Sequence, residues 1–204
     1  MTSLILLAAY LIGSIPTALI VGKVFFNIDI REHGSNNPGA TNSLRVLGKK
    51  AAIIVLLVDV GKGAVAASLP LYFQTELEPL HIGLIAVVGH CFPIFANFRG
   101  GKAIATTAGV LLVSNLWMLL VAYVTFFAVI FVSKYVFFGS ISVGVALLIF
   151  SLIEPGNDNE LIFSLFLLFL LFLHRTNIKN FLSNNELKIN DNRLKDDRIT
   201  TKRK

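Results

Sequence analysis

Seven apolar segments, separated by polar connections, make up most of the chain up to residue 173. The first covers residues 3–26, more than the roughly 20 residues that a helix needs to cross a bilayer. The fourth and seventh are short for a full span, so we expect tilted or broken helices there. The pattern predicts an all-α integral membrane protein with seven transmembrane helices, some short or broken. After the first, the segments are residues 51–73, 81–98, 103–113, 116–132, 140–153 and 161–173.

The first segment is interrupted by Gly13, Ser14, Ile15, Pro16 and Thr17. Proline in a membrane helix frees a backbone carbonyl, which a neighbouring helix or a hydroxyl must then satisfy. Ser14 and Thr17 are local candidates for this role. The small residues also favour close approach of another helix, so we interpret the interruption as a packing feature.

The second segment contains an acid and a base, Asp59 and Lys62, on one helix face. Charges inside a span mark either a functional site or an internal ion pair. Their opposite signs and their spacing favour an ion pair that supports the fold or the residues around a site, without being a reacting group.

The composition supports the membrane interpretation. Hydrophobic residues make up 55% of the chain and charged residues 15%, against about 25% charged residues in soluble domains. The N-terminal residues lack a basic region and a small-residue cleavage site, so we expect no cleavable signal peptide. The single cysteine, Cys91, excludes a disulfide framework and a cysteine-cluster metal site.

The positions of the basic residues predict the orientation. The connections after the second, fourth and sixth segments hold no Lys or Arg, whereas the alternate connections are basic. By the positive-inside rule the N-terminus lies outside and the C-terminus in the cytoplasm. Residues 1–187 are expected to form one membrane domain, and residues 188–204 a basic cytoplasmic tail, disordered or on the membrane surface. The basic connections hold Arg31, Arg45, Lys49, Lys50, Arg99, Lys102, Lys134, Arg175 and Lys179.

A polar stretch at residues 34–42, followed by Arg45, lies within the otherwise apolar part of the chain. Its glycines and asparagines tolerate left-handed backbone, which can turn successive N–H groups toward one anion. Hydroxyl and guanidinium groups add donors. A solvated turn is the alternative, because Gly, Pro, Asn and Ser dominate turns. The candidate anion-binding residues are Ser35, Asn36, Asn37, Gly39, Ala40, Thr41, Asn42 and Arg45.

Two further polar clusters follow. A basic glycine turn places Lys102 at the start of a helix, where the N–H groups and the dipole favour an anion; the alternative is a positive-inside anchor. His90, beside a proline break, faces either a ligand or a partner within the bundle. The third cluster begins at His174 and includes Asn177.

The predicted topology puts all three clusters at the cytoplasmic face. Their donors suit phosphate. The chain shows neither the paired carboxylates of a magnesium site, nor a zinc-type cluster, nor a serine nucleophile elbow. We therefore expect a reaction on phosphorylated substrates that needs no metal and no cofactor.

These motifs together resemble the bacterial acyl-phosphate-dependent glycerol-3-phosphate acyltransferases. The resemblance covers residues 3 to about 187 and rests on residues 34–42 with Arg45, residues 89–93 with 98–106, and residues 174–178 with Glu186. It implies a seven-helix enzyme of the bacterial inner membrane, with its active site at the cytoplasmic face. This enzyme acylates the 1-hydroxyl of glycerol 3-phosphate with an acyl phosphate, the first acylation of phospholipid synthesis.

The resemblance also implies roles for individual residues. Ser35, Arg45 and Lys102 would bind the phosphate of glycerol 3-phosphate, and the backbone of residues 36–42 would cradle the acyl phosphate. His174 and Asn177 would orient the reacting groups, and His90 joins the substrate-binding set. The expected partners are the two substrates and membrane lipid, with no nucleic acid and a monomeric protein.

The chain departs from the family pattern at three places where the family commonly has glycine. Asn36 is expected to be a mild change, because Asn can adopt left-handed backbone. Ala103 is expected to open a helix, where Ala is favourable. The last motif reads Ser183, Asn184, Asn185, Glu186.

Two other functions are considered. A small organophosphate or anion transporter would use broken helices and a cationic site near the midplane, but here the basic groups gather at one face and no paired half-helices recur. A transferase that uses coenzyme A is disfavoured, because its His-x4-Asp signature and a domain for coenzyme A are missing.

Overall fold

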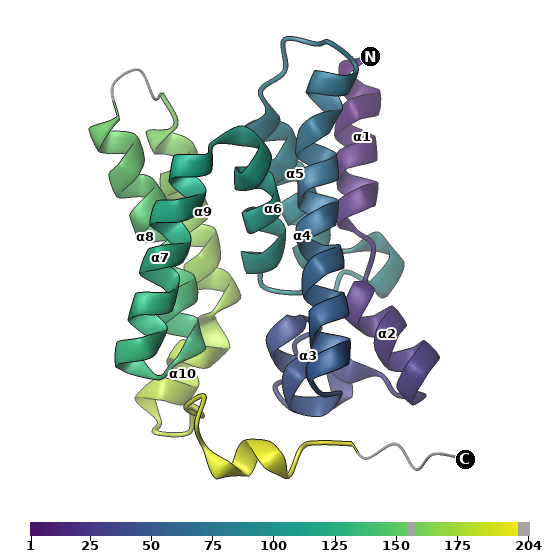
Figure 1. Ribbon diagram of the computed structural model, residues 1–204, viewed down its shortest axis with the longest axis vertical. Helices are drawn as coiled ribbons and strands as arrows, with labels where there is room; N and C mark the ends of the chain where they lie inside the picture. The colour runs from purple at the N-terminus through teal and green to yellow at the C-terminus, as the bar shows by residue number, and fades with distance from the viewer. Residues whose placement is uncertain (155–157, 200–204) are drawn as a thin grey trace. The chain divides into compact units, whose positions relative to one another are not determined.

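The computed structural model describes residues 1–154 and 158–199. It forms two compact units, which we describe separately: unit 1, residues 1–114 with the tail from Asn192, and unit 2, Asn115–Asp191 (Figure 1). The central residues of the connection at 154–160 and the last five residues of the predicted tail lie outside the described residues.

Unit 1 is built on a packed group of helices. α1 packs against α4 and α5, and α6 packs against the same two helices. Short elements connect the longer helices and carry the polar stretch at residues 33–39. The helices are α1 (Thr2–Gly13), α2 (Thr17–Phe26), η1 (Ile30–Glu32), α3 (Ala40–Val46), α4 (Lys49–Tyr72), α5 (Pro79–Cys91), η2 (Ile94–Ala96), α6 (Ile104–Ser114) and, in the tail, η3 (Asn192–Lys195).

The described residues of unit 2 form four helices in chain order. α8 packs against both α7 and α9, and α9 meets α10 at a bend of 55°. The helices are α7 (Leu116–Ser133), α8 (Val136–Ile153), α9 (Glu160–Leu173) and α10 (Arg175–Leu182).

Each predicted apolar segment corresponds to a helix or to a broken pair of helices, which confirms the all-α membrane class. The sixth segment begins earlier than predicted, at Val136, and the third is α5 followed by η2. Among the described residues, five segments are long and apolar enough to cross a membrane, or six when the bent pair α9–α10 counts as one span. α6 is apolar but shorter.

Glycines allow the close helix contacts of unit 1. A Cβ on Gly13 would overlap the backbone of Ala86 on α5, and a Cβ on Gly63 would overlap the Thr106 carbonyl on α6. The predicted close approach at the break in the first segment is therefore confirmed.

At the break in the first segment, a side chain of α4 bonds to the backbone, whereas local hydroxyls were expected to do so. The Ile15 carbonyl accepts a hydrogen bond of 2.9 Å from the Lys62 Nζ on α4. The Thr17 hydroxyl donates to Asp59 at 2.9 Å, and the Ser14 hydroxyl has no partner among the described residues. The carbonyl that Pro16 frees is that of Ile12, four residues earlier, and it accepts the Ile15 N–H at 3.3 Å. The prediction that Ser14 and Thr17 serve the freed carbonyl is therefore wrong.

The acid and base on α4 form the predicted internal ion pair. Lys62 Nζ lies 2.8 Å from Asp59 Oδ1, and the two residues are 5% and 1% exposed. A charge buried this deeply is tolerated where it is paired and hydrogen-bonded.

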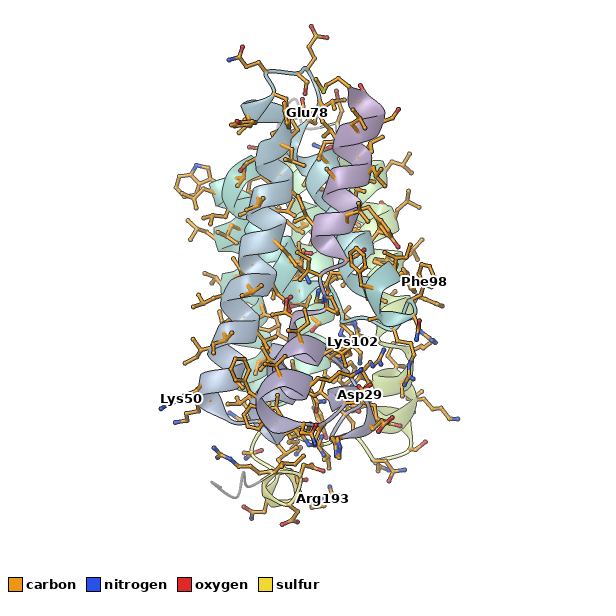
Figure 2. The ribbon with its side chains drawn as sticks, turned by 90° about the vertical axis from the view of Figure 1, so that its right-hand side faces the viewer. Asp29, Lys50, Glu78, Phe98, Lys102 and Arg193 are labelled. Carbon is orange, nitrogen blue, oxygen red and sulfur yellow. The ribbon has the colours of Figure 1, made fainter. Side chains whose placement is uncertain are left out.

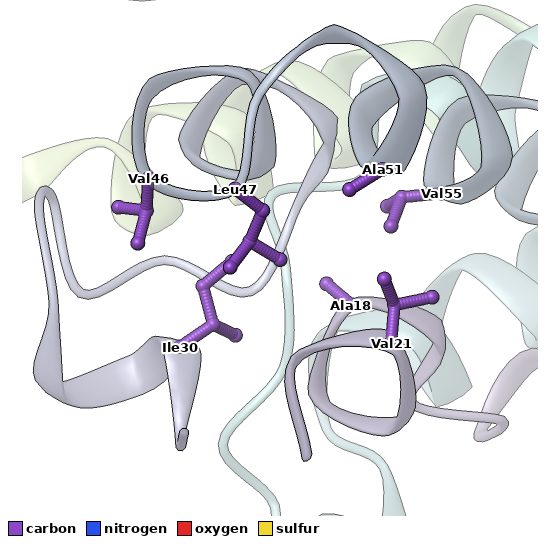
Figure 3. Close-up of a cluster of buried hydrophobic side chains, with 7 residues drawn as sticks. All are labelled: Ala18, Val21, Ile30, Val46, Leu47, Ala51 and Val55. Carbon is purple, nitrogen blue, oxygen red and sulfur yellow. The ribbon is translucent and has the colours of Figure 1, made fainter. Parts of the chain in front are cut away.

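A hydrophobic cluster anchors the polar connection to the helices. Side chains from α2, η1, α3 and α4 meet in it, so the elements on either side of residues 33–39 share one core (Figure 3). The cluster comprises Ala18, Val21, Ile30, Val46, Leu47, Ala51 and Val55.

Candidate functional site

The polar loop, residues 33–39 between η1 and α3, takes the left-handed backbone that its composition predicts. Gly34 has a φ of 60° and Asn36 a φ of 59°. A Cβ on Gly34 would overlap the Asn42 side chain, so glycine is required there. The expectation that Asn36 adopts left-handed backbone is confirmed.

Asn42 holds this loop together. Its side chain is buried, with 1% of the residue exposed, and its amide group donates to the His33 carbonyl at 3.0 Å and to the Ile30 carbonyl at 3.3 Å. Its Oδ1 accepts the Ser35 N–H at 2.9 Å. Asn42 therefore fixes the loop from beneath, a role for which its position in the sequence gave no signal.

Several backbone N–H groups of the loop are engaged within it. Ser35 donates to Asn42, Asn36 donates to the His33 carbonyl at 3.0 Å, and Gly39 donates to the Asn37 carbonyl at 3.0 Å. The first helical hydrogen bond of α3 runs from the Ser43 N–H to the Gly39 carbonyl. The N–H groups of Ala40, Thr41 and Asn42 lie in the first turn of α3, where N–H groups have no acceptor within the helix.

Arg45 lies on α3, one turn beyond the loop. Its guanidinium forms an ion pair with Asp197 of the tail, and its side chain is 19% exposed. The basic group expected to bind a phosphate thus holds a carboxylate in the structure.

The Gly-Gly-Lys turn is built on the end of α5. Gly100 donates its N–H to the Cys91 carbonyl and Gly101 donates to the His90 carbonyl, each at 3.1 Å. A Cβ on Gly101 would overlap the His90 ring, so the turn lies directly against this buried side chain. His90 also lies 3.7 Å from Asp59, measured from Nδ1 to Oδ1.

Lys102 stands two residues before α6, which begins at Ile104. Between them Ala103 is fully buried and has a φ of 72°. The expectation that Ala103 opens the helix is wrong, because the turn needs left-handed backbone there, where a side chain is unfavourable.

A small pocket in unit 1 brings several of these elements together. Residues of the helix break, the loop's Pro38, the glycine turn, His90 and Lys62 all line it. Lys62 was expected to support the fold or the residues around a site, and it lies in the wall of this pocket. A cation within a membrane span was the signal in the sequence that pointed there.

Arg31, which sequence analysis used only for orientation, is buried at the entry to the polar loop. Its guanidinium bonds Asp29 through Nε at 3.0 Å and Nη2 at 2.7 Å, and Nη1 donates to the Ala96 carbonyl at 2.8 Å. The hydrogen bonds from Arg31 lower the pKa of Asp29 to about 2. The spacing of an acid and an arginine two residues apart was the available signal.

His174 and Asn177 belong to unit 2. His174 is buried at the junction of α9 and α10, with Nδ1 2.9 Å from the Leu170 carbonyl. Asn177 Nδ2 donates to Glu186 Oε1 at 2.6 Å. Asn184, within the motif that lacks the family's usual glycine, takes a φ of 56°. The last motif is therefore held together by its own contacts.

Comparison with known proteins decides the family. The family model described as glycerol-3-phosphate acyltransferase matches residues 3–184. The chain belongs to this family. It is 47% identical over 191 residues to the glycerol-3-phosphate acyltransferase of Bacillus cytotoxicus, covering 93% of this chain and 96% of that protein. The corresponding protein of Macrococcus caseolyticus is 45% identical over 187 residues, covering 92% and 96%.

The fold is that of solved members of the family. The crystal structure of PlsY, an integral membrane glycerol 3-phosphate acyltransferase, in its glycerol 3-phosphate form has a TM-score of 0.83 and 29% identity, covering 91% of this chain and 94% of that one. Its lysophosphatidic acid form gives 0.80 and 28%, with coverage of 91% and 93%. The predicted activity is thereby confirmed: the chain is a multi-pass membrane enzyme of phospholipid synthesis that acylates glycerol 3-phosphate, which yields lysophosphatidic acid.

Proposed function

We propose that the acyl donor is a fatty acyl phosphate and that the 1-hydroxyl of glycerol 3-phosphate is the acceptor, giving 1-acylglycerol 3-phosphate and phosphate. One observation carries the proposal: the polar loop and the glycine turn that leads to Lys102 contribute to the same pocket. Two substrates that each carry a phosphate need two anion sites, and these elements supply donors for both. The reaction uses neither a metal nor a cofactor.

The residues divide between the two substrates. Ser35, Arg45 and Lys102 bind the phosphate of glycerol 3-phosphate. The acyl phosphate is cradled by the backbone of residues 36–42, and the N–H groups at the start of α3 are its donors because those of Asn36 and Gly39 serve the loop itself. In unit 2, His174 and Asn177 orient the reacting groups.

The acyl transfer depends mainly on how the two substrates are positioned against each other. An acyl phosphate is a mixed anhydride with a good leaving group, so holding the hydroxyl about 3 to 3.5 Å from the carbonyl supplies much of the acceleration. Donors around the carbonyl and the leaving phosphate stabilise the charge that develops in the transition state. The hydroxyl proton passes to a substrate phosphate or to His174.

We propose seven spans: the five long segments, the bent α9–α10 pair and the short α6. In unit 1 the acidic connection at Glu78 lies at one end, and Asp29, Lys50 and Arg193 lie toward the other (Figure 2). The positive-inside rule then places the loop and the glycine turn at the cytoplasmic face of the bacterial inner membrane, with the N-terminus outside. The enzyme works as a monomer.

A donor panel tests this proposal. Purified protein in detergent is given glycerol 3-phosphate with palmitoyl phosphate, palmitoyl coenzyme A or palmitoyl acyl carrier protein, all in the presence of EDTA. We expect lysophosphatidic acid and phosphate from palmitoyl phosphate alone. Product from either thioester but not from the acyl phosphate would refute the donor assignment, and uptake of glycerol 3-phosphate into proteoliposomes without acylation would favour a transporter.

A further inference from the structure

The Arg31 side chain joins two segments that are far apart in the sequence. It is buried, with 10% of the side chain exposed, and its N–H groups point to two different partners. Two nitrogens hold the Asp29 carboxylate just before the polar loop, and the third holds the Ala96 carbonyl on η2. A planar guanidinium can serve both partners at once, whereas a lysine ammonium is a single point of charge.

The two joined segments lead directly to the proposed substrate sites. Arg31 lies on η1, two residues before the polar loop. Ala96 is followed by Asn97 and Phe98, both with left-handed backbone, and then by the turn that ends at Lys102. The hydrogen bond to Ala96 thus spans 65 residues and fixes the start of one site against the start of the other.

We propose that Arg31 is a positioning residue that sets the distance between the donor site in the loop and the acceptor site at the glycine turn. This inference rests on the substrate assignments made above. Arg31 is held away from solvent by Asp29 and Ala96, so it acts through the backbone of these two segments. Its loss therefore leaves each substrate site intact and changes their alignment.

Arg31→Lys tests this role. Because misplacement by about 1 Å can lower a rate on the order of 100-fold, we expect kcat to fall roughly 10- to 100-fold. The KM for palmitoyl phosphate and for glycerol 3-phosphate should each stay within about threefold, since each site keeps its own donors. Asp29→Asn, which keeps the bond to Ala96, should give a smaller fall in kcat and serves if Arg31→Lys fails to fold.

The matched control is Lys50→Gln, which removes an exposed cation from the same unit. A kcat per folded molecule equal to that of the unaltered enzyme in both Arg31→Lys and Asp29→Asn would overturn the proposal, because a merely structural role changes only the yield of folded protein. Unaltered protein that makes no lysophosphatidic acid would instead count against the proposed function.

The tail makes a second, independent set of contacts at the other side of the loop. Both Nε and Nη2 of Arg45 contact Asp197 Oδ2. The Ile199 N–H donates to the Val46 carbonyl at 3.0 Å, and the Ile199 side chain packs against the cluster of Figure 3. The Arg198 guanidinium lies where a Cβ on Gly48 would stand. The tail is thus bound to α3 by polar and apolar contacts together.

A carboxylate and a phosphate use the same N–H groups of a guanidinium. We infer that Asp197 is a built-in competitor of glycerol 3-phosphate for Arg45, so that the tail must leave before the acceptor's phosphate binds. This inference rests on the proposed role of Arg45. The tail follows the residues 3–184 that the family model matches. In this inference the tail has an inhibitory function.

The test compares full-length variants. A partly exposed pair of this kind contributes up to about 1 kcal/mol, so Asp197→Asn should lower the KM for glycerol 3-phosphate roughly two- to fivefold. Neither kcat nor the KM for palmitoyl phosphate should change. Asp196→Asn, a neutralisation at the neighbouring position, is the matched control for net charge.

Arg45→Ala separates this inference from the proposed function. It should raise the KM for glycerol 3-phosphate, and in its background Asp197→Asn should have no further effect. An unchanged KM in Asp197→Asn, or a fall equally large in Asp196→Asn, would overturn the competitor role. An unchanged KM in Arg45→Ala would remove Arg45 from the acceptor site and count against the proposed function.

Discussion

Ala103→Gly should stabilise the enzyme. Ala103 is fully buried and holds a φ of 72°, between the basic glycine turn and α6. In left-handed backbone a Cβ stands too close to a carbonyl oxygen, and only glycine avoids the penalty. The substitution removes that strain without altering the hydrogen bond from the Thr107 N–H to the Ala103 carbonyl.

Three terms set the magnitude of the change in stability, one favourable and two opposing. Relief of the left-handed strain contributes about 1 to 2 kcal/mol. The greater freedom of glycine in the unfolded chain opposes this by about 0.4 to 1 kcal/mol, and the lost methyl group removes a further part of the gain. With about 0.8 kcal/mol for the methyl group, the net stabilisation is at most about 0.8 kcal/mol, which corresponds to a rise in Tm of up to about 3 °C for a chain of this size.

Thermal unfolding in detergent measures this change, with Ala108→Gly as the matched control. Ala108 lies within α6, where the backbone is helical, so the same substitution should cost about 1 kcal/mol and lower the Tm. Opposite signs for the two variants would confirm the strain at position 103. A fall in Tm for Ala103→Gly as large as that for Ala108→Gly would refute the reasoning.

Three further predictions concern packing, pH and the last motif. Gly63→Ala should destabilise by about 1 to 3 kcal/mol because its Cβ would overlap the α6 backbone, whereas Gly61→Ala meets nothing within 4 Å and should be neutral or stabilising in the same unfolding assay. The pKa of Asp29 is lowered from 3.8 to about 2, so its stabilisation of about 2 kcal/mol is present above pH 4 and lost as the pH falls toward 2. The Tm difference between the unaltered enzyme and Asp29→Asn should shrink over that range and stay constant above it. Glu186→Ala should lower kcat roughly 10- to 100-fold by releasing Asn177 from a charge-assisted hydrogen bond, and Glu186→Gln, which keeps an acceptor oxygen, should retain most activity.

Much of the fold follows from the sequence because hydropathy and length limit what a membrane segment can be. Each apolar segment became helical, since backbone groups in lipid must be satisfied within their own segment. The ion pair of Asp59 and Lys62 was also predictable, because a spacing of three residues on a helix brings the side chains together. The left-handed Asn36 followed from the local preference of its residue type.

The features that sequence analysis missed depend on partners distant in the chain. The acceptor for Lys62 is a carbonyl 47 residues away, and the hydrogen-bond partner of Arg31 is 65 residues away. The carboxylate on Arg45 comes from 152 residues further on. Local patterns report helix faces and turn types, but they do not show which distant group will meet a buried donor.

The polar features of unit 1 that the sequence presented separately form one connected network. The Ile15 carbonyl, next to Pro16, accepts a hydrogen bond from Lys62, which is also paired with Asp59. Asp59 also accepts a hydrogen bond from the Thr17 hydroxyl and lies beside His90. The ring of His90 packs against Gly101, and the His90 carbonyl accepts the Gly101 N–H. Because a buried charge is costly when one partner is removed, a change at any point leaves another group uncompensated. The helix break, the ion pair and the glycine turn are therefore parts of a single support beneath the pocket, which explains why charged residues are tolerated within the span.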